Sequence, residues 1–538
     1  MSKQPAKREQ WSGQFGFLLA AIGSAVGLGN IWRFPGVAYS NGGGAFLLPY
    51  LFALVLVGIP VLLFDYAMGH RYRGSAPTIY RRIKPISEWI GWFQVLVCFV
   101  IMSYYAVVIG WAGSYAWFSA KLAWGQDAKA FFFGDYLQLA DAPGVSASPV
   151  WQVLVPLVGV WAIALFIIAR GVAGGLEKAN KIFLPLLVVL FGALVVRSLF
   201  LPGALEGLTA FFTPKWSALA DPSVWMAAFA QIFYSLSIGF GIMLTYASYL
   251  KRRSNLGATG LVAAFANSSF EILAGVGVFA ALGFMAHQQN VGVGDLQGIT
   301  GVGLSFITFP TIIGMMPAGA LFGVLFFSSL FLAGLTSLVS LIQVVAAALQ
   351  EKFGLTNTRA ALAAGIPAAV VSVVLFSTTT GLYSLDIVDK HINEIGIVFI
   401  AVVALVYMSL FQKRLPELRM SINVVSSLYV GRWWQWFVGG LIPAALAYML
   451  GTTLWSLINE PYEGYPWWML IVLGFGSVGL AGAVTAFFSW LPWRNNVDNY
   501  KPIKLPANVP PRPDRNGNGN GNGRAAGAKA AASTAKEN

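Results

Sequence analysis

Charged residues and cysteine are both scarce in this chain. Only 10% of its 538 residues are Asp, Glu, Lys or Arg, whereas an ordinary soluble domain carries about 25%. The single cysteine, Cys98, lies inside an apolar run, which excludes a disulfide framework and a thiolate metal cluster. The three histidines, His70, His287 and His391, fall near the ends of apolar runs. The apolar segments therefore hold little of the chemistry that an enzyme needs, and we do not expect an enzyme.

Apolar residues instead make up 57% of the chain. A membrane-spanning helix takes about 20 consecutive, mostly apolar residues, and the sequence has many such runs. We expect an all-α, multi-pass membrane protein with about twelve transmembrane helices. The predicted spans are 12–37, 44–70, 90–122, 149–170, 180–202, 221–250, 256–286, 317–350, 358–378, 391–412, 431–457 and 466–490. Segment 296–313 is apolar but interrupted by Gly and Pro, which favours a re-entrant or loop helix.

Basic residues gather in alternate loops. With the N-terminus placed in the cytoplasm, the inner segments hold 20 Lys and Arg residues and the outer loops hold 5. Cytoplasmic loops of multi-pass proteins carry the excess of these residues, so we expect both termini in the cytoplasm and the protein in the inner or plasma membrane. The net charge of +13 follows from this pattern and from the tail, so it does not indicate a nucleic-acid partner.

Two predicted spans are interrupted by glycine. Gly23, Gly27 and Gly29 fall within seven residues of the first span, and each weakens a helix by roughly 1 kcal/mol relative to Ala. The sixth span has a second interruption at 235–241, SLSIGFG. Small residues also favour close helix contacts in membranes. Paired interrupted helices at matching positions of two halves point more strongly to the central site of a transporter, because unwound backbone in a membrane has to be buried or line a cavity.

Several long motifs carry further information. They are WSGQFGFLLAAIGSAVGLGNIWRFPGVAYSNGGGAFLLPYLFALVLVGIP in the first two spans, QIFYSLSIGFGIMLTYASY in the sixth, FLAGLTSLVSLIQ in the eighth, GLEKANKI after the fourth and LDIVDKHINEIG before the tenth. Over residues 8–490, and in this order, the chain resembles the neurotransmitter:sodium symporter family, especially its bacterial amino-acid members such as the leucine transporter. The resemblance implies sodium-coupled import of an amino acid by alternating access.

The family fold implies an order of parts. Two inverted repeats of five helices each, a leucine-transporter-type fold, would occupy residues 12–202 and 221–412, with unwound helices 1 and 6, and two further helices would lie within 431–490. Residues 1–11 would form a cytoplasmic segment with inner-gate residues. Residues 491–538, rich in Pro, Gly and Asn towards their end, are expected to form a cytoplasmic, largely disordered tail.

The resemblance also implies two sodium sites at the breaks. The implied ligands of the first site are Ala25, Asn30, Ser235 and Asn267, and those of the second are Gly23, Val26, Ala333, Thr336 and Ser337. Carbonyl, amide and hydroxyl oxygens suit hard cations, and neutral ones suit a monovalent ion. An intramembrane Asn also forms interhelical hydrogen bonds, and paired hydroxyls also bond to their own helix, so these readings stay open.

The substrate would lie between the two broken helices. The implied contact residues are Ala25, Gly27, Gly29, Ile101, Tyr105, Tyr234, Ser237, Phe240, Leu338 and Leu341. Its carboxylate would meet the Tyr105 hydroxyl and the amides of 27–29, since helix N-termini favour anions. Amine-transporting relatives place an Asp where this chain has Gly27, so the missing carboxylate favours an amino acid. The apolar lining favours a hydrophobic or aromatic one.

Charged residues in spans are costly and usually functional. By resemblance, Arg33 pairs with Asp389 as an outer gate. The implied inner-gate residues are Arg8, Trp11, Tyr249 and Glu351. For Arg8 alone, a solvated charge or a lipid-headgroup contact is the ordinary reading. Glu394 receives no role.

Glu271 is a buried-carboxylate candidate of another kind. It lies four residues after Asn267, one turn along the same helix face. Chloride-dependent relatives have Ser at this position, so the carboxylate is expected to replace chloride, with Tyr50 and Gln231 as neighbours. A protonated, purely structural Glu is the alternative. Asp65 in the second span is expected to be structural.

Two other functions are compatible with the sequence. One is a proton- or sodium-coupled carrier of a different small solute. The other is a membrane-embedded transferase, for which the side chains are lacking. Binding of a solute only in the presence of sodium, with two ions expected, separates a symporter from an enzyme.

Overall fold

The computed structural model describes residues 9–296, 298–299, 301–498 and 500. Within these ranges the chain is helical almost throughout, and its only strand-like pairings are two isolated bridges, Gly43–Pro214 and Pro149–Thr378. Arg8 and the tail beyond residue 500 lie outside the described residues. The expectations for them therefore stay predictions.

Ten helical stretches in the described part of the chain are long and apolar enough to cross a membrane. They are Gly44–Tyr72, Pro85–Ser119, Trp151–Ala169, Val172–Leu199, Leu256–Gln289, Gly319–Phe353, Asn357–Phe376, Gly381–Phe411, Trp433–Gly464 and Trp467–Trp490. An eleventh span is a bent pair, α1 (Gln14–Ala25) and the helix Gly29–Ser40, whose axes differ by 51°. Each of these overlaps a predicted span, so the prediction of an all-α, multi-pass protein is confirmed.

The remaining predicted span, 221–250, is broken in two. Its parts are α11 (Pro222–Ser235) and α12 (Ile242–Ser248), each too short to cross a membrane. Between them φ is positive at Ser237 (53°), Gly239 (86°) and Gly241 (94°). Glycine adopts this conformation at little cost, so the glycine pair ends one helix and lets the next begin. This is why eleven spans, and not twelve, are found by length and composition among the described residues.

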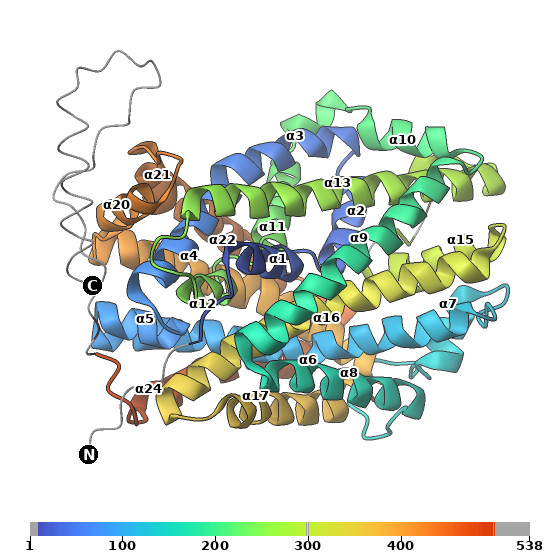
Figure 1. Ribbon diagram of the computed structural model, residues 1–538. Coiled ribbons are helices and arrows are strands. Elements are labelled where there is room, and N and C mark those ends of the chain that lie inside the picture. Colours follow the sequence, from blue (N-terminus) through green and yellow to red (C-terminus); the bar gives the residue numbers. More distant parts are fainter. Residues whose placement is uncertain (1–8, 297, 300, 499, 501–538) are drawn as a thin grey trace, which may run out of the picture. The chain divides into compact units, whose positions relative to one another are not determined.

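Two long helices form the centre of the bundle (Figure 1). They are α6 (Glu88–Ser119) and α16 (Gly319–Phe353), which pack against each other and bury 83% of their most apolar stretches. In contrast, only 28% of that stretch is buried for α9 (Lys178–Leu199) and α24 (Gly476–Trp490). Their apolar faces point away from the protein, as expected where lipid is the solvent.

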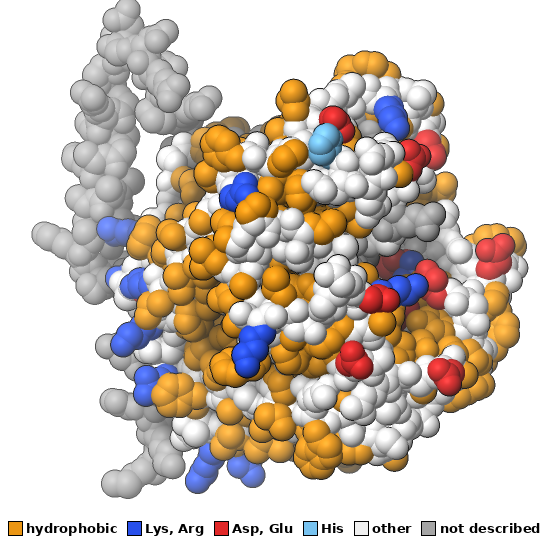
Figure 2. Space-filling model, turned by 90° about the vertical axis from the view of Figure 1, so that its right-hand side faces the viewer, with side chains coloured by type: hydrophobic (Ala, Val, Ile, Leu, Met, Phe, Trp, Pro, Cys, Tyr) orange, Lys and Arg blue, Asp and Glu red, His pale blue; other side chains and the backbone are white. Residues whose placement is uncertain are grey.

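Short helices mark the two ends of the bundle. In Figure 1, α10 (Ala204–Phe212) and α15 (Phe309–Met315) lie at one end, which we call the α10–α15 end. α5 (Ala76–Ile83) and α20 (Leu415–Val425) lie at the other, the α5–α20 end. Segment Gly301–Met315 is a short apolar helix, in agreement with the predicted loop helix. Figure 2 looks onto the α10–α15 end, where acidic and basic side chains lie next to one another at a hollow.

The described part of the predicted tail is attached to the bundle at the α5–α20 end. The hydrogen bonds that hold it include Trp493 Nε1 to Glu88 (2.8 Å), Arg494 N–H to the Lys352 carbonyl (3.0 Å) and the Tyr500 hydroxyl to the Arg71 carbonyl (2.6 Å). Lys352 is buried and pairs with Glu88 at 2.7 Å. Residues 491–498 and 500 thus cover a buried ion pair, while the expected disorder of the tail stays a prediction.

Candidate functional site

The first helix ends at Ala25 and releases backbone carbonyl groups. In an uninterrupted helix each N–H donates to the carbonyl four residues earlier. Three N–H groups donate elsewhere here: Gly27 to Asn30 Oδ1 (2.8 Å), Leu28 to the Tyr105 hydroxyl (3.2 Å) and Asn30 to the Gly27 carbonyl (3.2 Å). The carbonyl groups of Gly23, Ser24 and Val26 have therefore lost their usual helical donors. They are acceptors in the buried centre of the protein.

Three predicted ligands of the first sodium site form one hydrogen-bonded chain. Asn30 Nδ2 donates to Asn267 Oδ1 (2.9 Å), and Asn267 Nδ2 donates to the Ser235 hydroxyl (2.5 Å). Ser235 is the last residue of α11, and Asn267 lies in α13 (Leu256–Gln289). Both broken helices and α13 thus meet at these polar groups. The hydrogen bond between Asn30 and Asn267 joins two helices, so it also fits the alternative in which an intramembrane Asn only links neighbouring helices.

The second predicted sodium site lies where α16 crosses the end of α1. The Ser337 hydroxyl donates to the Ser24 carbonyl (3.2 Å), and so does the Ser237 hydroxyl from the break after α11 (3.3 Å). The Thr336 hydroxyl donates to the Ala333 carbonyl in its own helix (2.9 Å). Of the paired hydroxyls, one therefore bonds within its helix and the other reaches across to α1.

A cavity of about 280 Å³ lies beside these residues. Ala25, Asn30 and Ser235 of the first predicted sodium site line it, and so does Ser337 of the second. The lining of the cavity includes nine of the ten predicted substrate residues: Ala25, Gly27, Gly29, Ile101, Tyr105, Tyr234, Ser237, Phe240 and Leu341. Leu338 is fully buried and lies outside this lining. Consecutive helical residues point about 100° apart, so that Ser337 faces the cavity while Leu338 does not.

Further lining residues were missed by sequence reasoning. They are Ser24, Leu28, Trp32, Tyr104, Val108, Ile242, Leu385, Asp386, Asn393 and Ile397, together with Gly301 and Val302 of the loop helix. Asp386 and Asp389 both belong to α18 (Gly381–His391), and their spacing of three places them on one helix face. That spacing is a signal the sequence did offer. Asp386 accepts hydrogen bonds from the Tyr462 and Tyr465 hydroxyls (3.2 and 3.0 Å).

The two predicted outer-gate charges face the same cavity without an ion pair between them in the described structure. The Arg33 guanidinium lies 4.3 Å from the centroid of the Tyr234 ring. Asn393 Nδ2 donates to the Asp389 carboxylate (2.7 Å). The side chains of this gate are therefore close enough to share a cavity, but each is engaged with a different neighbour.

The inner-gate residues lie at the opposite side of the break. Trp11 is buried, its backbone N–H donates to the Tyr249 carbonyl (3.3 Å), and the Trp11 and Tyr249 rings lie 6.2 Å apart. The Glu351 carboxylate accepts from the N–H and the hydroxyl of Ser75 (both 2.8 Å). Arg8 is outside the described residues, so its pairing with Glu351 stays a prediction. The buried indole of Trp11 donates to the Tyr246 carbonyl (2.9 Å) in α12.

Glu271 lies fully buried in α13. It accepts hydrogen bonds from the Tyr50 hydroxyl and from Gln231 Nε2 (2.5 Å for the latter). Both predicted neighbours are thereby confirmed. Gln231 also lines the cavity. The side chain of Gln231 therefore connects the Glu271 carboxylate to the cavity in which the substrate is expected.

The break between α11 and α12 is held by buried polar groups. Asp65 accepts from the Gly239 N–H (3.1 Å), and Gln94 Nε2 donates to the Gly239 carbonyl (2.9 Å). The Cys98 thiol donates to the Phe240 carbonyl (3.3 Å). These groups satisfy unwound backbone that water cannot reach, as a buried segment requires. The contact agrees with the structural role expected for Asp65.

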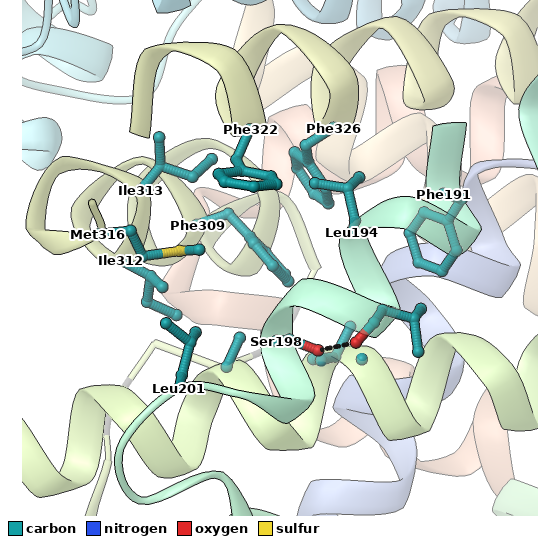
Figure 3. A pocket seen from close by; sticks show the side chains of 14 residues that line it. Phe191, Leu194, Ser198, Leu201, Phe309, Ile312, Ile313, Met316, Phe322 and Phe326 are labelled. Carbon is teal, nitrogen blue, oxygen red and sulfur yellow. Dashed lines mark hydrogen bonds between the residues drawn. The ribbon is translucent and has the colours of Figure 1, made fainter. Parts of the chain in front are cut away.

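A second pocket shows what a packing gap looks like by comparison (Figure 3). Residues of α9, α13, α15 and α16 line it, among them Phe191, Phe309 and Phe326. Its one hydroxyl, that of Ser198, donates to the Val195 carbonyl (2.8 Å). It offers no free polar group to orient a solute, whereas the central cavity does.

The sequence and the fold of this chain are similar to those of known proteins. The sequence profile of the Sodium:neurotransmitter symporter family matches residues 8–131 and 125–491. The chain belongs to this family. An uncharacterized sodium-dependent transporter of Methanocaldococcus jannaschii is 40% identical over 464 residues, which are 85% of this chain and 93% of that protein. The rat sodium- and chloride-dependent GABA transporter 2 is 31% identical over 519 residues, 86% of this chain and 83% of that protein.

A solved structure agrees with these relatives. The crystal structure of MhsT in complex with L-phenylalanine shares 32% sequence identity and superimposes with a TM-score of 0.69, covering 83% of this chain and 100% of that one. The symporter is therefore a sodium-dependent, multi-pass membrane transporter with the fold of MhsT, and it is not an enzyme. Membership of the family was the prediction that the motifs carried, and it is confirmed.

Proposed function

We propose that this symporter imports an amino acid, hydrophobic or aromatic, together with sodium by alternating access. The observation that carries the proposal is the central cavity, in which released carbonyls, an amide cluster and apolar side chains meet. MhsT, whose structure contains L-phenylalanine, has the same fold. The apolar lining residues Ile101, Phe240 and Leu341 suit such a side chain.

The position of Gly27 favours an amino acid over a monoamine. A β-carbon placed there would lie 2.7 Å from the Ser337 hydroxyl oxygen and 3.1 Å from the Tyr105 hydroxyl oxygen. An aspartate at this position would need its neighbours to move. The substrate then has to bring its own carboxylate, which would lie at the N-terminal end of the helix Gly29–Ser40, where an anion is stabilised.

We assign two sodium ions to the site. The first would be held by the Ala25 carbonyl, the Asn30 and Asn267 amide oxygens and the Ser235 hydroxyl, and completed by the substrate carboxylate. The second would be held by Gly23, Val26, Ala333, Thr336 and Ser337. The released carbonyls of Gly23 and Val26 support the second site, because an acceptor without its helical donor is available to a cation.

The carboxylate of Glu271 supports chloride-independent transport. It lies one turn from Asn267 and is bonded to Gln231 at the cavity wall. A fixed negative charge here would balance the two sodium ions, which in chloride-dependent relatives is the work of the anion. A structural, protonated Glu is the competing explanation.

The residues of the two gates also support an orientation of the protein in the membrane. Trp11 is buried beneath the break, while Arg33 and Asp389 both line the cavity and are engaged with different neighbours, Tyr234 and Asn393. We place the α10–α15 end outside the cell and the α5–α20 end, with both termini, in the cytoplasm. This arrangement describes the outward-facing half of the transport cycle.

Uptake into proteoliposomes tests the proposal directly. The purified symporter is reconstituted, and the uptake of each of the twenty amino acids is measured with sodium, potassium or choline outside. Accumulation of a hydrophobic or aromatic amino acid only with sodium is expected. Equal uptake with all three cations would overturn the proposed coupling, and sodium-driven uptake of none of the twenty would overturn the substrate class.

A further inference from the structure

Asn180, in the GLEKANKI motif, has no role in the site described so far. It lies near the start of α9 and is fully buried. Its Nδ2 donates to the Leu176 carbonyl (2.9 Å), whereas its Oδ1 has no hydrogen-bond partner in the described structure. Turning the amide over would set two oxygen atoms against each other, so the Leu176 contact fixes its orientation. A buried amide oxygen without a partner is costly and needs a reason.

The unpartnered oxygen points at the first helix. A β-carbon placed on Gly23 would collide with Asn180 Oδ1, so the absent side chain of Gly23 leaves the space that this oxygen occupies. Gly23 is also one of the residues whose carbonyl has lost its helical donor. α9 packs against both α1 and α16, the helices assigned to the second sodium site (Figure 1).

The surroundings leave this oxygen available to a cation. Glu177, one turn earlier, accepts from the Ser12 N–H (2.9 Å) and pairs with Lys181 (2.7 Å), so both of these charges are already engaged. The lining of the central cavity includes Ser24 and Ser337 but not Asn180. Asn180 therefore approaches Gly23, near the break that ends α1, from the side away from the substrate.

We propose that Asn180 Oδ1 is an additional sodium ligand, adjoining the second sodium site on its inner side. The inference rests on the proposed sodium site at Gly23. A neutral amide oxygen is a ligand that hard cations accept, and it would meet the ion as it leaves the broken helix. The oxygen then has a partner in one part of the transport cycle and lacks one in the state described here.

Sodium alone is the ligand for the test, since the first site needs the substrate carboxylate and the second does not. The full-length protein is purified, and its thermal stabilisation by NaCl is titrated against choline chloride at constant ionic strength. Asn180→Leu keeps the size of the side chain and removes its oxygen. We expect it to raise the half-maximal sodium concentration about three- to tenfold, with Asn180→Asp retaining a response near that of the unchanged protein. An unaltered sodium titration in Asn180→Leu would overturn the inference.

A matched control separates ion binding from loosened packing. Asn423 bonds the Val430 carbonyl and N–H through both ends of its amide (3.0 and 2.7 Å) and lies in α20. Asn423→Leu is expected to leave the sodium titration unchanged, and a shift as large as that of Asn180→Leu would overturn the inference. If Asn180→Leu does not fold, Asn180→Ala is measured in its place with the same expectation. Failure of the proposed function shows differently, as absence of any sodium response in the unchanged protein.

Discussion

Asn30 connects the break in the first helix to the rest of the site. Its Oδ1 accepts from the Gly27 N–H and its Nδ2 donates to Asn267. One side chain thus holds the conformation of the break and reaches the second amide of the cluster. In the proposed site the same two amides touch the sodium ion that the substrate carboxylate completes.

Replacing either amide should therefore weaken two ligands at once. Asn30→Ala or Asn267→Ala is expected to raise both the half-maximal sodium concentration and the Kd for the amino acid by about tenfold or more, since a lost contact to a charged group costs about 1.5–3 kcal/mol. Equilibrium binding of radiolabelled amino acid across a sodium series measures both. Asn459→Ala, whose amide bonds only within its own helix, is the control. A variant that weakened one ligand alone would contradict a shared site.

Glu271 supplies a buried carboxylate close to the proposed sodium sites. Glu271→Ser removes the buried carboxylate and should make uptake depend on chloride, because a diffusible anion can then supply the missing negative charge. Uptake is compared in chloride and in gluconate at fixed sodium. Glu394→Ser, which only breaks a half-exposed pair with Lys390, should stay indifferent to chloride. Chloride-independent uptake by Glu271→Ser would leave Glu271 with a structural role only.

At the scale of elements, the segment 491–500 closes over the buried pair of Lys352 and Glu88. Trp493 donates to Glu88, and the Lys352 ammonium lies 4.9 Å from the Trp493 ring centroid. The Arg81 guanidinium also pairs with the Glu88 carboxylate (3.0 Å). Partly uncovering such a network leaves polar groups without partners.

Deleting residues 491–538 is expected to destabilise the protein by about 1–3 kcal/mol, the usual cost of leaving buried polar groups unpaired. Deleting only residues 501–538 keeps every contact described for this segment and serves as the control. Thermal unfolding in detergent, followed by tryptophan fluorescence, compares the two. Equal melting temperatures for both deletions would show that the segment does not stabilise the bundle.

Much of this arrangement was predictable because it follows from local chemistry. The length of apolar runs gave the spans, and the glycines at 23, 27 and 29 gave the first break. The neighbours of Glu271 followed from the family motifs. Contacts set by distant parts of the chain were not predictable in this way. The orientation of Leu338 and the attachment of Trp493 depend on how helices pack, which no local pattern in the sequence encodes.

For the whole molecule, the proposed stoichiometry makes transport electrical. Two sodium ions and one zwitterion would move two charges, for which a potential of 100 mV supplies roughly 4.6 kcal/mol, enough for about a thousand-fold accumulation. A potassium diffusion potential, negative inside, set with valinomycin should therefore accelerate uptake into proteoliposomes. Reversing the potential should slow it. Uptake that ignores the potential would rule out this stoichiometry.

The central claim is that the broken first helix binds sodium and an amino acid together. The most direct measurement is equilibrium binding of L-phenylalanine, and then of the other amino acids, to the purified protein in NaCl and in KCl. The account predicts saturable binding of at least one hydrophobic or aromatic amino acid in NaCl and its loss in KCl. Binding of the same affinity in both salts would contradict it.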